Sequence, residues 1–315
     1  MPAPWTKHGS SPSPARFTPT NPGYWLAGLA SEQIAGKPYA DVMTDRLFRP
    51  LGMTRTTLRP TLAMTWPLAL GHEVRSGKPT IVRPQANNAA TWPAGQMYSN
   101  VTDLARFTTA FLDAGRLAGE QVLAPSLIAT LSSPLVPRPG DDGHYGYGLS
   151  VSNERGVRIW QHGGSRTGYG STIRLAPDQK IALIILTNRS ASSLPKTAAA
   201  ALEMLLPFQS KPAVASSKSE PLTEKQMADL AGSYTNNRQT IELTIKDGHL
   251  IARRTGGETS TSESSLALAG ENRLAVLAGS PNDGSDRTRT TYFVVRDPAG
   301  HPEYLLSGSR AYKRK

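Results

Sequence analysis

The sequence predicts an α+β protein, in which an antiparallel sheet with flanking helices is followed by a small antiparallel β domain. Helical periodicity fills much of the first half, and three consecutive strand patterns follow it: "GVRIWQ", "YGSTIRLA" and "KIALIILTN". Beyond Gly232, short runs alternate apolar and polar residues, which is typical of antiparallel strands with one buried face. A length of 315 residues suits one large and one small domain.

Residues typical of helix starts and ends, together with the spacing of apolar residues, predict the helices of the first half. Pro22 suits a first turn and Gly36 can end that helix, whose apolar residues Trp25, Leu26, Leu29 and Ile34 fall close to one face. The other predicted helices are "KPYADVMTDRLFRPLGM", Val101 to Asp113, Pro125 to Leu131, and "SSLPKTAAAALEMLLP". The last of these could cover the sheet.

The run from Ile181 to Leu186 is apolar throughout, so it predicts a central strand covered on both faces. The last segment predicts a curled sheet or barrel, with turns at "KDGH" and "DPAGH". We expect a disordered Pro/Ser-rich N-terminus over residues 1–16, a first domain over 17–207, a linker over 208–221 and a second domain over 222–315.

Charge and composition narrow the function classes. The net charge is +11, but the basic residues are scattered and form no stripe interleaved with aromatics, so a solvated basic surface is favoured over nucleic-acid binding. The chain contains no cysteine, which excludes disulfides and thiolate catalysis. It has no apolar run near 18 residues and no apolar signal core in "MPAPWTKHGSSPSPAR", so we expect no membrane span and no secretory signal in this chain.

Metal and cofactor sites are not expected. The histidines at positions 72, 144, 249 and 301 lack metal-ligand spacing, and no His-Glu-x-x-His occurs. The segment "GDDGHYGYG" lacks the ligand order of an EF-hand. No Gly-rich phosphate loop appears.

Two stretches carry a family resemblance: "NPGYWLAGLASEQIAGKPYADVMTDRLFRPLGM" and "QHGGSRTGYGSTIRLAPDQKIALIILTN". With "PAGQMYSNVTDLARFTTAFLDAG" between them, they resemble the serine β-lactamase-like family of class C β-lactamases, DD-peptidases and related esterases, over residues 17–207. Residues 222–315 resemble the small β domain often attached to such hydrolases. The resemblance implies acyl transfer, in which a serine attacks an amide, lactam or ester, and it implies export from the cytoplasm.

The third motif of that family, His-x-Gly, is present as His162-Gly163-Gly164. The resemblance implies that His162 faces the pocket and that the N–H of Ser165 donates to an oxyanion. The alternative is a Gly-rich turn after an edge strand, with His162 merely exposed.

The region before that strand leads into the pocket in the family. Tyr145 and Tyr147 are therefore candidates to line it, and a plain loop before a strand is the alternative.

The second motif, Phe-x-Tyr-x-Asn, corresponds to residues 17–21, and Pro19 stands in the place of the tyrosine. Proline has no ionisable group and no N–H, so it cannot move a proton. Asn21 matches the asparagine of the motif, and its role is either that of an amide donor to a ligand or that of a helix N-cap. The other Tyr-x-Asn, Tyr98-Ser99-Asn100, follows the helix start, and we expect Asn100 to cap the next helix with support from Asp103.

The first motif, Ser-x-x-Lys, is missing from the residues before Asn21. Its one literal match, Ser193 to Lys196, follows the His-Gly-Gly strand, and there Ser193 is expected to cap a helix. We therefore expect a truncated, inactive homologue with no intact catalytic residue. The alternatives are a non-catalytic protein that binds an acyl-peptide-like ligand, or a wrongly assigned start. A first domain without its preceding strands is expected to self-associate through exposed sheet or core.

Overall fold

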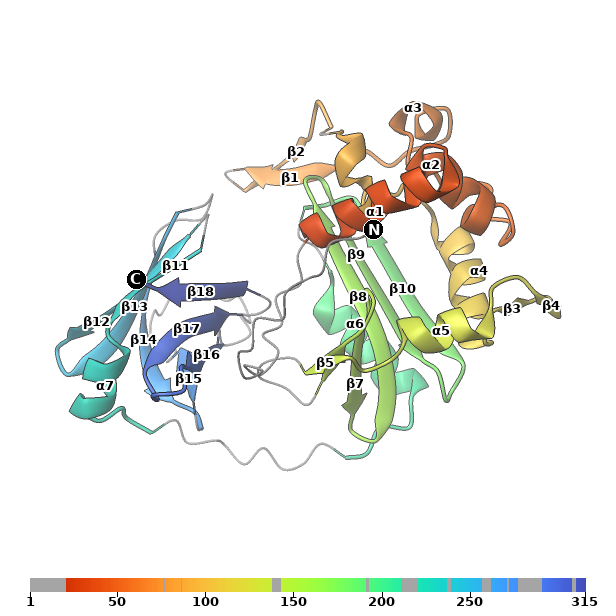
Figure 1. Ribbon diagram of the computed structural model, residues 1–315. Helices are drawn as coiled ribbons and strands as arrows, with labels where there is room; N and C mark the ends of the chain where they lie inside the picture. Colours follow the sequence, from red (N-terminus) through yellow and green to blue (C-terminus); the bar gives the residue numbers. More distant parts are fainter. Residues whose placement is uncertain are drawn as a thin grey trace, which may run out of the picture. The chain divides into compact units, whose positions relative to one another are not determined.

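The computed structural model describes residues 21–75, 77–85, 87–137, 143–190, 193–210, 220–236, 239–256, 262–270, 272–276, 291–307 and 310–315. The expected disordered segment 1–16, Pro19 and most of the expected linker lie outside these residues. The chain divides into two compact units, one among the described residues up to 210 and one from 220 onward (Figure 1). The predicted α+β class is confirmed: helices and a sheet build the first unit, and antiparallel strands build the second.

Helices make up most of the first half of the first unit. They are α1 (Asn21–Ala35), α2 (Tyr39–Met43), the π-helix η1 (Thr44–Phe48), α3 (Pro60–Ala63), the 3-10 helix η2 (Ala89–Ala94), α4 (Val101–Leu112), α5 (Pro125–Leu131) and α6 (Pro195–Leu205). Two small hairpins lie among them, β1 (His72–Arg75) with β2 (Lys78–Ile81) and β3 (Arg116–Leu117) with β4 (Glu120–Gln121). Gly36, with a φ of +64°, ends α1 as predicted.

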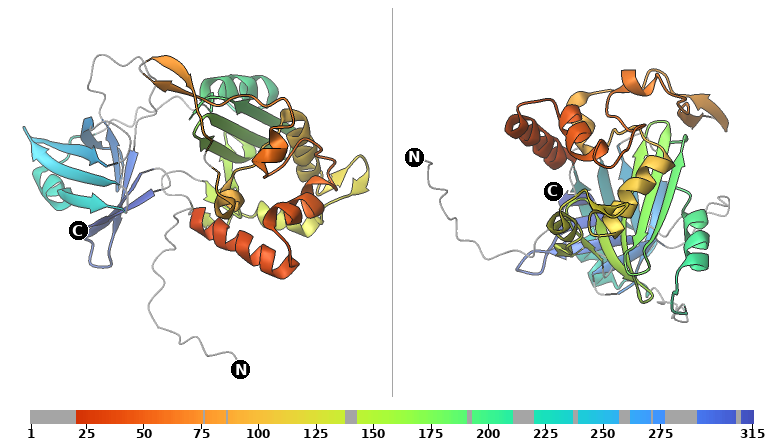
Figure 2. Two further views of the ribbon diagram at one scale, coloured as in Figure 1. Left: turned by 90° about the horizontal axis from the view of Figure 1, so that it is seen from above. Right: turned by 90° about the vertical axis from the view of Figure 1, so that its right-hand side faces the viewer.

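An antiparallel sheet forms the other half of this unit, in the order β10-β9-β8-β7-β6-β5. Its strands are β5 (Val136–Pro137), β6 (His144–Tyr145), β7 (Ser150–Glu154), β8 (Val157–Arg166), β9 (Tyr169–Ala176) and β10 (Ile181–Thr187). The helices α4 and α6 lie on opposite faces (Figure 2). Phe111 of α4 packs edge-on against Trp160 on one face, and Leu202 of α6 packs with Ile159 on the other.

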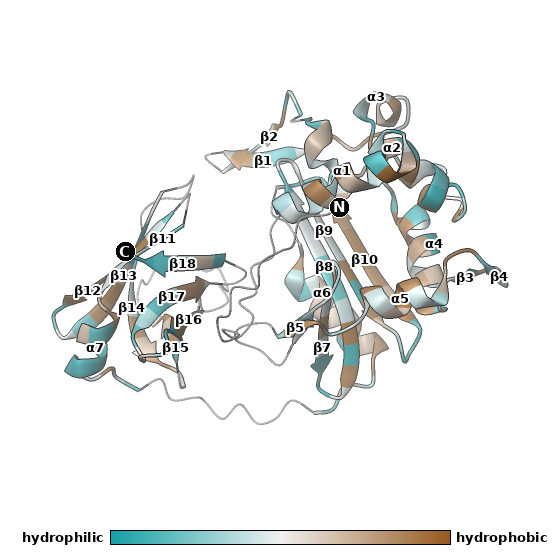
Figure 3. Cartoon of the chain, in the orientation of Figure 1, coloured by the Kyte–Doolittle hydropathy of each residue, from teal (hydrophilic) through white to brown (hydrophobic). Residues whose placement is uncertain are grey.

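The position predicted for the apolar strand was wrong. Among the described residues β10 is the edge of the sheet, although Figure 3 shows it largely brown, as a hydrophobic strand. Both of its faces are covered, since Ile184 packs on the α4 side and Leu183 on the α6 side. The run is apolar throughout because both faces of the strand are covered. A continuous apolar run therefore does not indicate whether a strand is central or at the edge of its sheet.

Two further local expectations need correction. The apolar residues predicted to share a face of α1 are mostly exposed, up to 88% for Ile34. Ser193 does not cap α6: the N-cap residue is Leu194 in the left-handed region, and the Ser193 carbonyl accepts a hydrogen bond from the Thr172 hydroxyl. The proline at the first turn of α6 is as expected.

The second unit is a closed antiparallel barrel, as the alternating pattern predicted. Its strands are β11 (Gly232–Thr235), β12 (Thr240–Lys246), β13 (His249–Thr255), β14 (Ser262–Leu268), β15 (Arg273–Val276), β16 (Thr291–Arg296), β17 (Pro302–Ser307) and β18 (Arg310–Arg314). Pairing of Tyr234 with Arg314 joins the first strand to the last, so the described strands leave no open edge.

One helix, α7 (Glu224–Leu230), precedes the barrel and packs into its core. Thr223 and Gln226 form a capping box at its start, and the Tyr234 hydroxyl donates to the Leu230 carbonyl at its end. The barrel core draws only on residues between Leu222 and Tyr312, so this unit has a hydrophobic core of its own.

Candidate active site

The C-terminal half of β8 carries the residues of the His-Gly-Gly motif. Side chains alternate across a strand, and Trp160 faces α4, so His162 points to the α4 face of the sheet. Pairing with β7 ends at Gln161, whereas pairing with β9 continues to Arg166. The segment from His162 to Arg166 thus projects beyond β7 and is exposed, although neighbouring protein atoms partly desolvate the His162 ring.

The backbone direction of Ser165 follows from the turn beside it. Arg166 and Tyr169 flank a two-residue turn, so they form a hydrogen-bonded pair. Hydrogen-bonded and non-hydrogen-bonded pairs alternate along an antiparallel ladder, and Ser165 therefore directs its N–H away from β9. Gly163 does the same. Both N–H groups point to the side on which β7 has ended.

A side chain at position 164 would meet a side chain of β9. A Cβ added to Gly164 would lie 2.5 Å from Oγ of Ser171, which is shorter than any normal contact. A side chain at this position would therefore require the Ser171 hydroxyl to rotate away.

His162 forms a hydrogen bond with one of the two tyrosine candidates. The Tyr145 hydroxyl lies 3.2 Å from Nε2 of His162, and the two rings meet edge-on. Tyr145 is the last residue of β6, which pairs with β7 beside the end of β8. Tyr147, 58% exposed, contributes no such contact.

A second tyrosine extends this contact into a series of hydrogen bonds. Tyr24 of α1 hydrogen-bonds to Tyr145, and burial first and this bond second raise the pKa of Tyr145 well above its ordinary value. Asn21 is the exposed first residue of α1, one turn before Tyr24, and so lies on the same side of that helix. Sequence reasoning missed Tyr24, although it belongs to the quoted "NPGY" stretch.

Burial lowers the pKa of His162 below its ordinary value, and a hydrogen bond between its ring and the Gly163 backbone works in the opposite direction. The imidazole is therefore neutral at neutral pH, and its Nε2 shares a hydrogen bond with the Tyr145 hydroxyl. Tyr145 stays protonated and is therefore not a base at neutral pH, and the Nε2 atom of the neutral His162 ring is occupied by its hydrogen bond with Tyr145.

The residues at 98–100 have a mainly structural role. The side chain of Asn100 accepts a hydrogen bond from the Asp103 N–H and caps α4, as predicted. The expected support from Asp103 to the first turn was wrong: its buried carboxylate accepts from the Arg55 N–H and the Thr56 hydroxyl instead. The Tyr98 backbone pairs with Thr57.

The turn after β8 is nevertheless close to this loop. Arg166 donates to the Gly95 carbonyl at 3.2 Å, and Tyr98 lies within electrostatic range of Arg166. The loop over residues 95–98 thus borders the same end of β8 as His162. Spacing along the sequence gave no signal for this neighbourhood.

Ser193 lies on the wrong face for a nucleophile in this site. Its carbonyl is bonded to Thr172, which pairs with Gly163 and shares the α6 face of the sheet. His162 points to the α4 face, so the sheet separates the two side chains.

The described residues were also compared with the requirements of a metal site and of a membrane-spanning helix. Across the described part of the chain, no group of three His, Cys, Asp or Glu side chains could hold a metal ion. None of the helices that the structure describes combines the length and the hydropathy needed to cross a bilayer.

The family model named Beta-lactamase matches residues 13–206, more than half of the sequence. The chain therefore belongs to the β-lactamase family, the class of serine hydrolases that its sheet and His-Gly-Gly strand resemble.

Particular relatives support the same assignment. The human protein beta-lactamase-like 1 is 30% identical over 184 residues, and the unguisins hydrolase of Aspergillus campestris is 28% identical over 192. These matches cover 58% of this chain but 35% of each relative, so the chain spans about a third of their length. A crystal structure of SurE with D-Leu superposes on 95% of this chain and 68% of SurE, with a TM-score of 0.71 and 25% identity.

Proposed function

We propose that the first unit holds an acyl-peptide ligand along β8, in a β-lactamase-like acyl-transfer site, and that the 315-residue chain does not cleave this ligand. The observation that carries the proposal is the projecting end of β8, where the N–H groups of Gly163 and Ser165 point away from β9. An extended peptide can add to such an edge through main-chain hydrogen bonds.

The ligand class follows from the motif and from a structural relative. In the family the N–H beyond the His-x-Gly motif binds the carbonyl oxygen of the acyl group, and Ser165 occupies that place. SurE was crystallised with D-Leu, and we extend this to a ligand with a D-configured aliphatic residue next to the bound carbonyl. Asn21 and Tyr145 are proposed to line the same pocket.

The absence of cleavage follows from the side chains that the sequence supplies. No Ser-x-x-Lys stands before the His-Gly-Gly strand, and Pro19 replaces the proton-carrying tyrosine. The protonated Tyr145 offers a hydrogen bond but no base, and no serine of a Ser-x-x-Lys motif stands beside His162 to be activated. Binding without turnover is the chemistry that these groups support.

Ligand titration of paired variants at Ser165 tests this proposal. Ser165→Pro deletes the N–H, and it costs no hydrogen bond of the β8–β9 ladder because that N–H points away from β9. We expect the affinity for N-acetyl-D-leucine amide, measured by NMR titration, to fall about fivefold to tenfold, which corresponds to one hydrogen bond of about 1 kcal/mol.

Ser165→Ala is the matched control, because it removes only the hydroxyl and keeps the N–H. Its affinity should equal that of the unmodified chain. Equal affinities for all three chains, or ligand-induced shifts confined to residues outside β8, would overturn the proposal.

A further inference from the structure

The barrel unit contains a cavity that no feature of the first unit uses. Its volume is about 300 Å³, at the lower end of the range for small-ligand pockets. Five aliphatic side chains from the start of α7 to β16 form its walls: Leu222, Leu230, Leu268, Leu274 and Val294. Three polar side chains complete the lining, and they determine what the cavity can hold.

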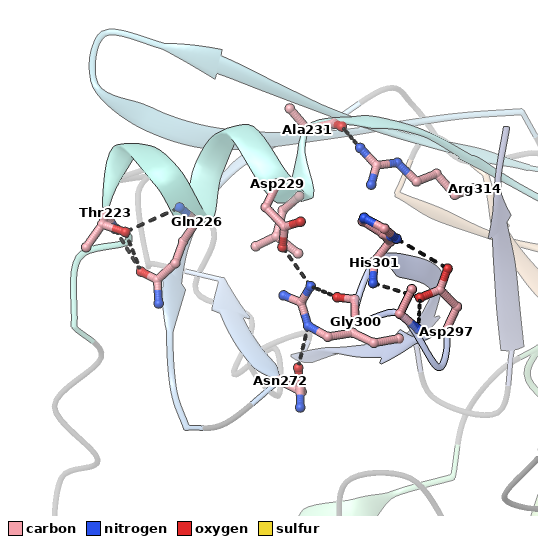
Figure 4. Close-up of polar contacts among 12 residues, drawn as sticks. Thr223, Gln226, Asp229, Ala231, Asn272, Asp297, Gly300, His301 and Arg314 are labelled. Atoms are coloured by element: carbon pink, nitrogen blue, oxygen red, sulfur yellow. Dashed lines mark hydrogen bonds and ion pairs between the residues drawn. The ribbon is translucent and has the colours of Figure 1, made fainter.

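Arg296, one of these three, is held in a fixed orientation at the end of β16. Its Nη1 donates to the Asp229 carboxylate at 2.7 Å and to the Gly300 carbonyl at 2.8 Å, and its Nε donates to Oδ1 of Asn272 at 3.1 Å. Figure 4 shows Asp229, Asn272 and Gly300 meeting at this one guanidinium group. A guanidinium held on three sides is preorganised to bind a further acceptor.

Gln226 is fixed in a similar way at the first turn of α7. Its Oε1 accepts from the backbone N–H of Thr223 at 2.9 Å, as part of the capping box (Figure 4). The oxygen of this amide is therefore committed to the helix, and its nitrogen is left as the group available to a ligand.

Hydrogen-bond donors are in excess around the cavity. Among the described residues, no hydrogen bond uses Nε2 of Gln226, Nδ2 of Asn272 or Nη2 of Arg296. The side-chain oxygens of both amides are already occupied. A ligand head group at this site must therefore supply acceptors rather than donors.

We propose that this cavity binds a small aliphatic monocarboxylic acid, with the carboxylate at Arg296, Asn272 and Gln226 and the chain against the leucines and Val294. A carboxylate carries only acceptors and matches a guanidinium edge. A single negative charge suits the site because Asp229 already balances part of the arginine charge. The aliphatic walls require an apolar remainder. This site is independent of the ligand proposed at β8.

A chain-length series on the full chain tests the assignment. Butanoate, hexanoate and octanoate, below the concentration at which they form micelles, are titrated against protein with labelled Leu and Val methyl groups. We expect shifts at Leu230, Leu274 and Val294, with affinity rising about fourfold per added methylene until the cavity is filled. Hexan-1-ol, which has the same chain length and no charge, should bind at least tenfold more weakly than hexanoate.

Two isosteric variants test the head-group contacts. Gln226→Glu keeps the capping box, and Asn272→Asp keeps the acceptor for Nε of Arg296 in a residue type that tolerates its φ of +54°. Each replaces a donor by a negative charge, so hexanoate affinity should fall tenfold or more while the melting temperature stays close to that of the unmodified chain.

Arg253→Gln is the control, because it lowers the net charge by the same amount at an exposed position on β13. It should bind hexanoate as the unmodified chain does. The proposal is overturned if hexanoate shifts none of the cavity methyls at millimolar concentration. It is also overturned if hexanol binds equally well, or if the two isosteric variants match the control.

Discussion

The contact between His162 and Tyr145 shows how burial sets the chemistry of single residues. Burial lowers the pKa of His162 and raises the pKa of Tyr145, so both side chains are neutral over the same wide pH range. A neutral pair can share one well-defined hydrogen bond, here between the Tyr145 hydroxyl and Nε2 of His162. The pair is thus suited to hold a pocket wall in place.

The titration of His162 is the first residue-scale prediction. Its pKa, followed by the chemical shift of the ring Cε1–H, should lie below the ordinary value of about 6.5. The neutral ring then stabilises the fold fully above that value, and this contribution is lost as the pH falls toward the pKa of the folded state. Tyr145→Phe should shift the pKa of His162, because it removes the hydroxyl that hydrogen-bonds to the ring. A pKa above the ordinary value would contradict the proposed contact.

Two polar residues at the start of α4 allow a second prediction. Asn100→Ala should lower the free energy of unfolding by about 1 kcal/mol, because it removes an N-cap. Asp103→Ala should cost about 2 to 3 kcal/mol, since it leaves the buried Thr56 hydroxyl and the Arg55 N–H without their charged acceptor. Denaturant unfolding measures both.

Asn88→Ala serves as the control for this pair, since Asn88 caps the exposed helix η2. If Asn88→Ala lowers the free energy of unfolding as much as Asp103→Ala does, the buried carboxylate has no special role.

At the scale of elements, local signals predicted type and extent well. Pro125 and Leu131 bound α5 as the sequence indicated, and the cap at Asn100 was found from its spacing to the first helical turn. Such signals act within a few residues, so a single sequence contains them.

The predictions that failed concern which part of the protein packs against a given helix or strand. The apolar face of α1 is exposed at Leu26, Leu29 and Ile34, and β10 stands at an edge in spite of its apolar run. Which surface meets a helix or strand depends on residues far away in the chain, and amphipathic spacing does not encode that partner. For the same reason spacing alone gave no sign that Tyr24 reaches Tyr145 or that Arg166 reaches Gly95.

The edge strand β10 leads to an element-scale prediction. An apolar edge strand presents unpaired backbone groups, and we expect the chain to self-associate through it. Leu186 is 38% exposed on this strand, and Leu186→Lys should weaken association about tenfold in sedimentation velocity experiments. Leu127→Lys, at a similarly exposed leucine on α5, should leave association unchanged. A monomer at all concentrations would contradict this expectation.

At the scale of the whole molecule, the two units have separate cores and are expected to differ in stability. The barrel closes on itself and its core residues all come from one stretch of chain, so residues 220–315 should unfold cooperatively as an isolated fragment. In residues 17–207, several apolar side chains of α1 and Leu186 of β10 are exposed, so that fragment should aggregate or be cut rapidly by proteases. Thermal melting and limited proteolysis of both fragments check this, and a protease-resistant, monomeric first fragment would refute it.

Our main proposal is that this chain retains the ligand-holding strand of a β-lactamase-family site without the groups that cleave. Its most direct test is the intact mass of the 315-residue chain after incubation with benzylpenicillin, together with NMR spectra that report on His162. We expect an unchanged mass and reversible, concentration-dependent shifts at His162 and Ser165. A stable mass increase, located by peptide mapping to a serine, would contradict it and would show that the chain contains a nucleophile after all.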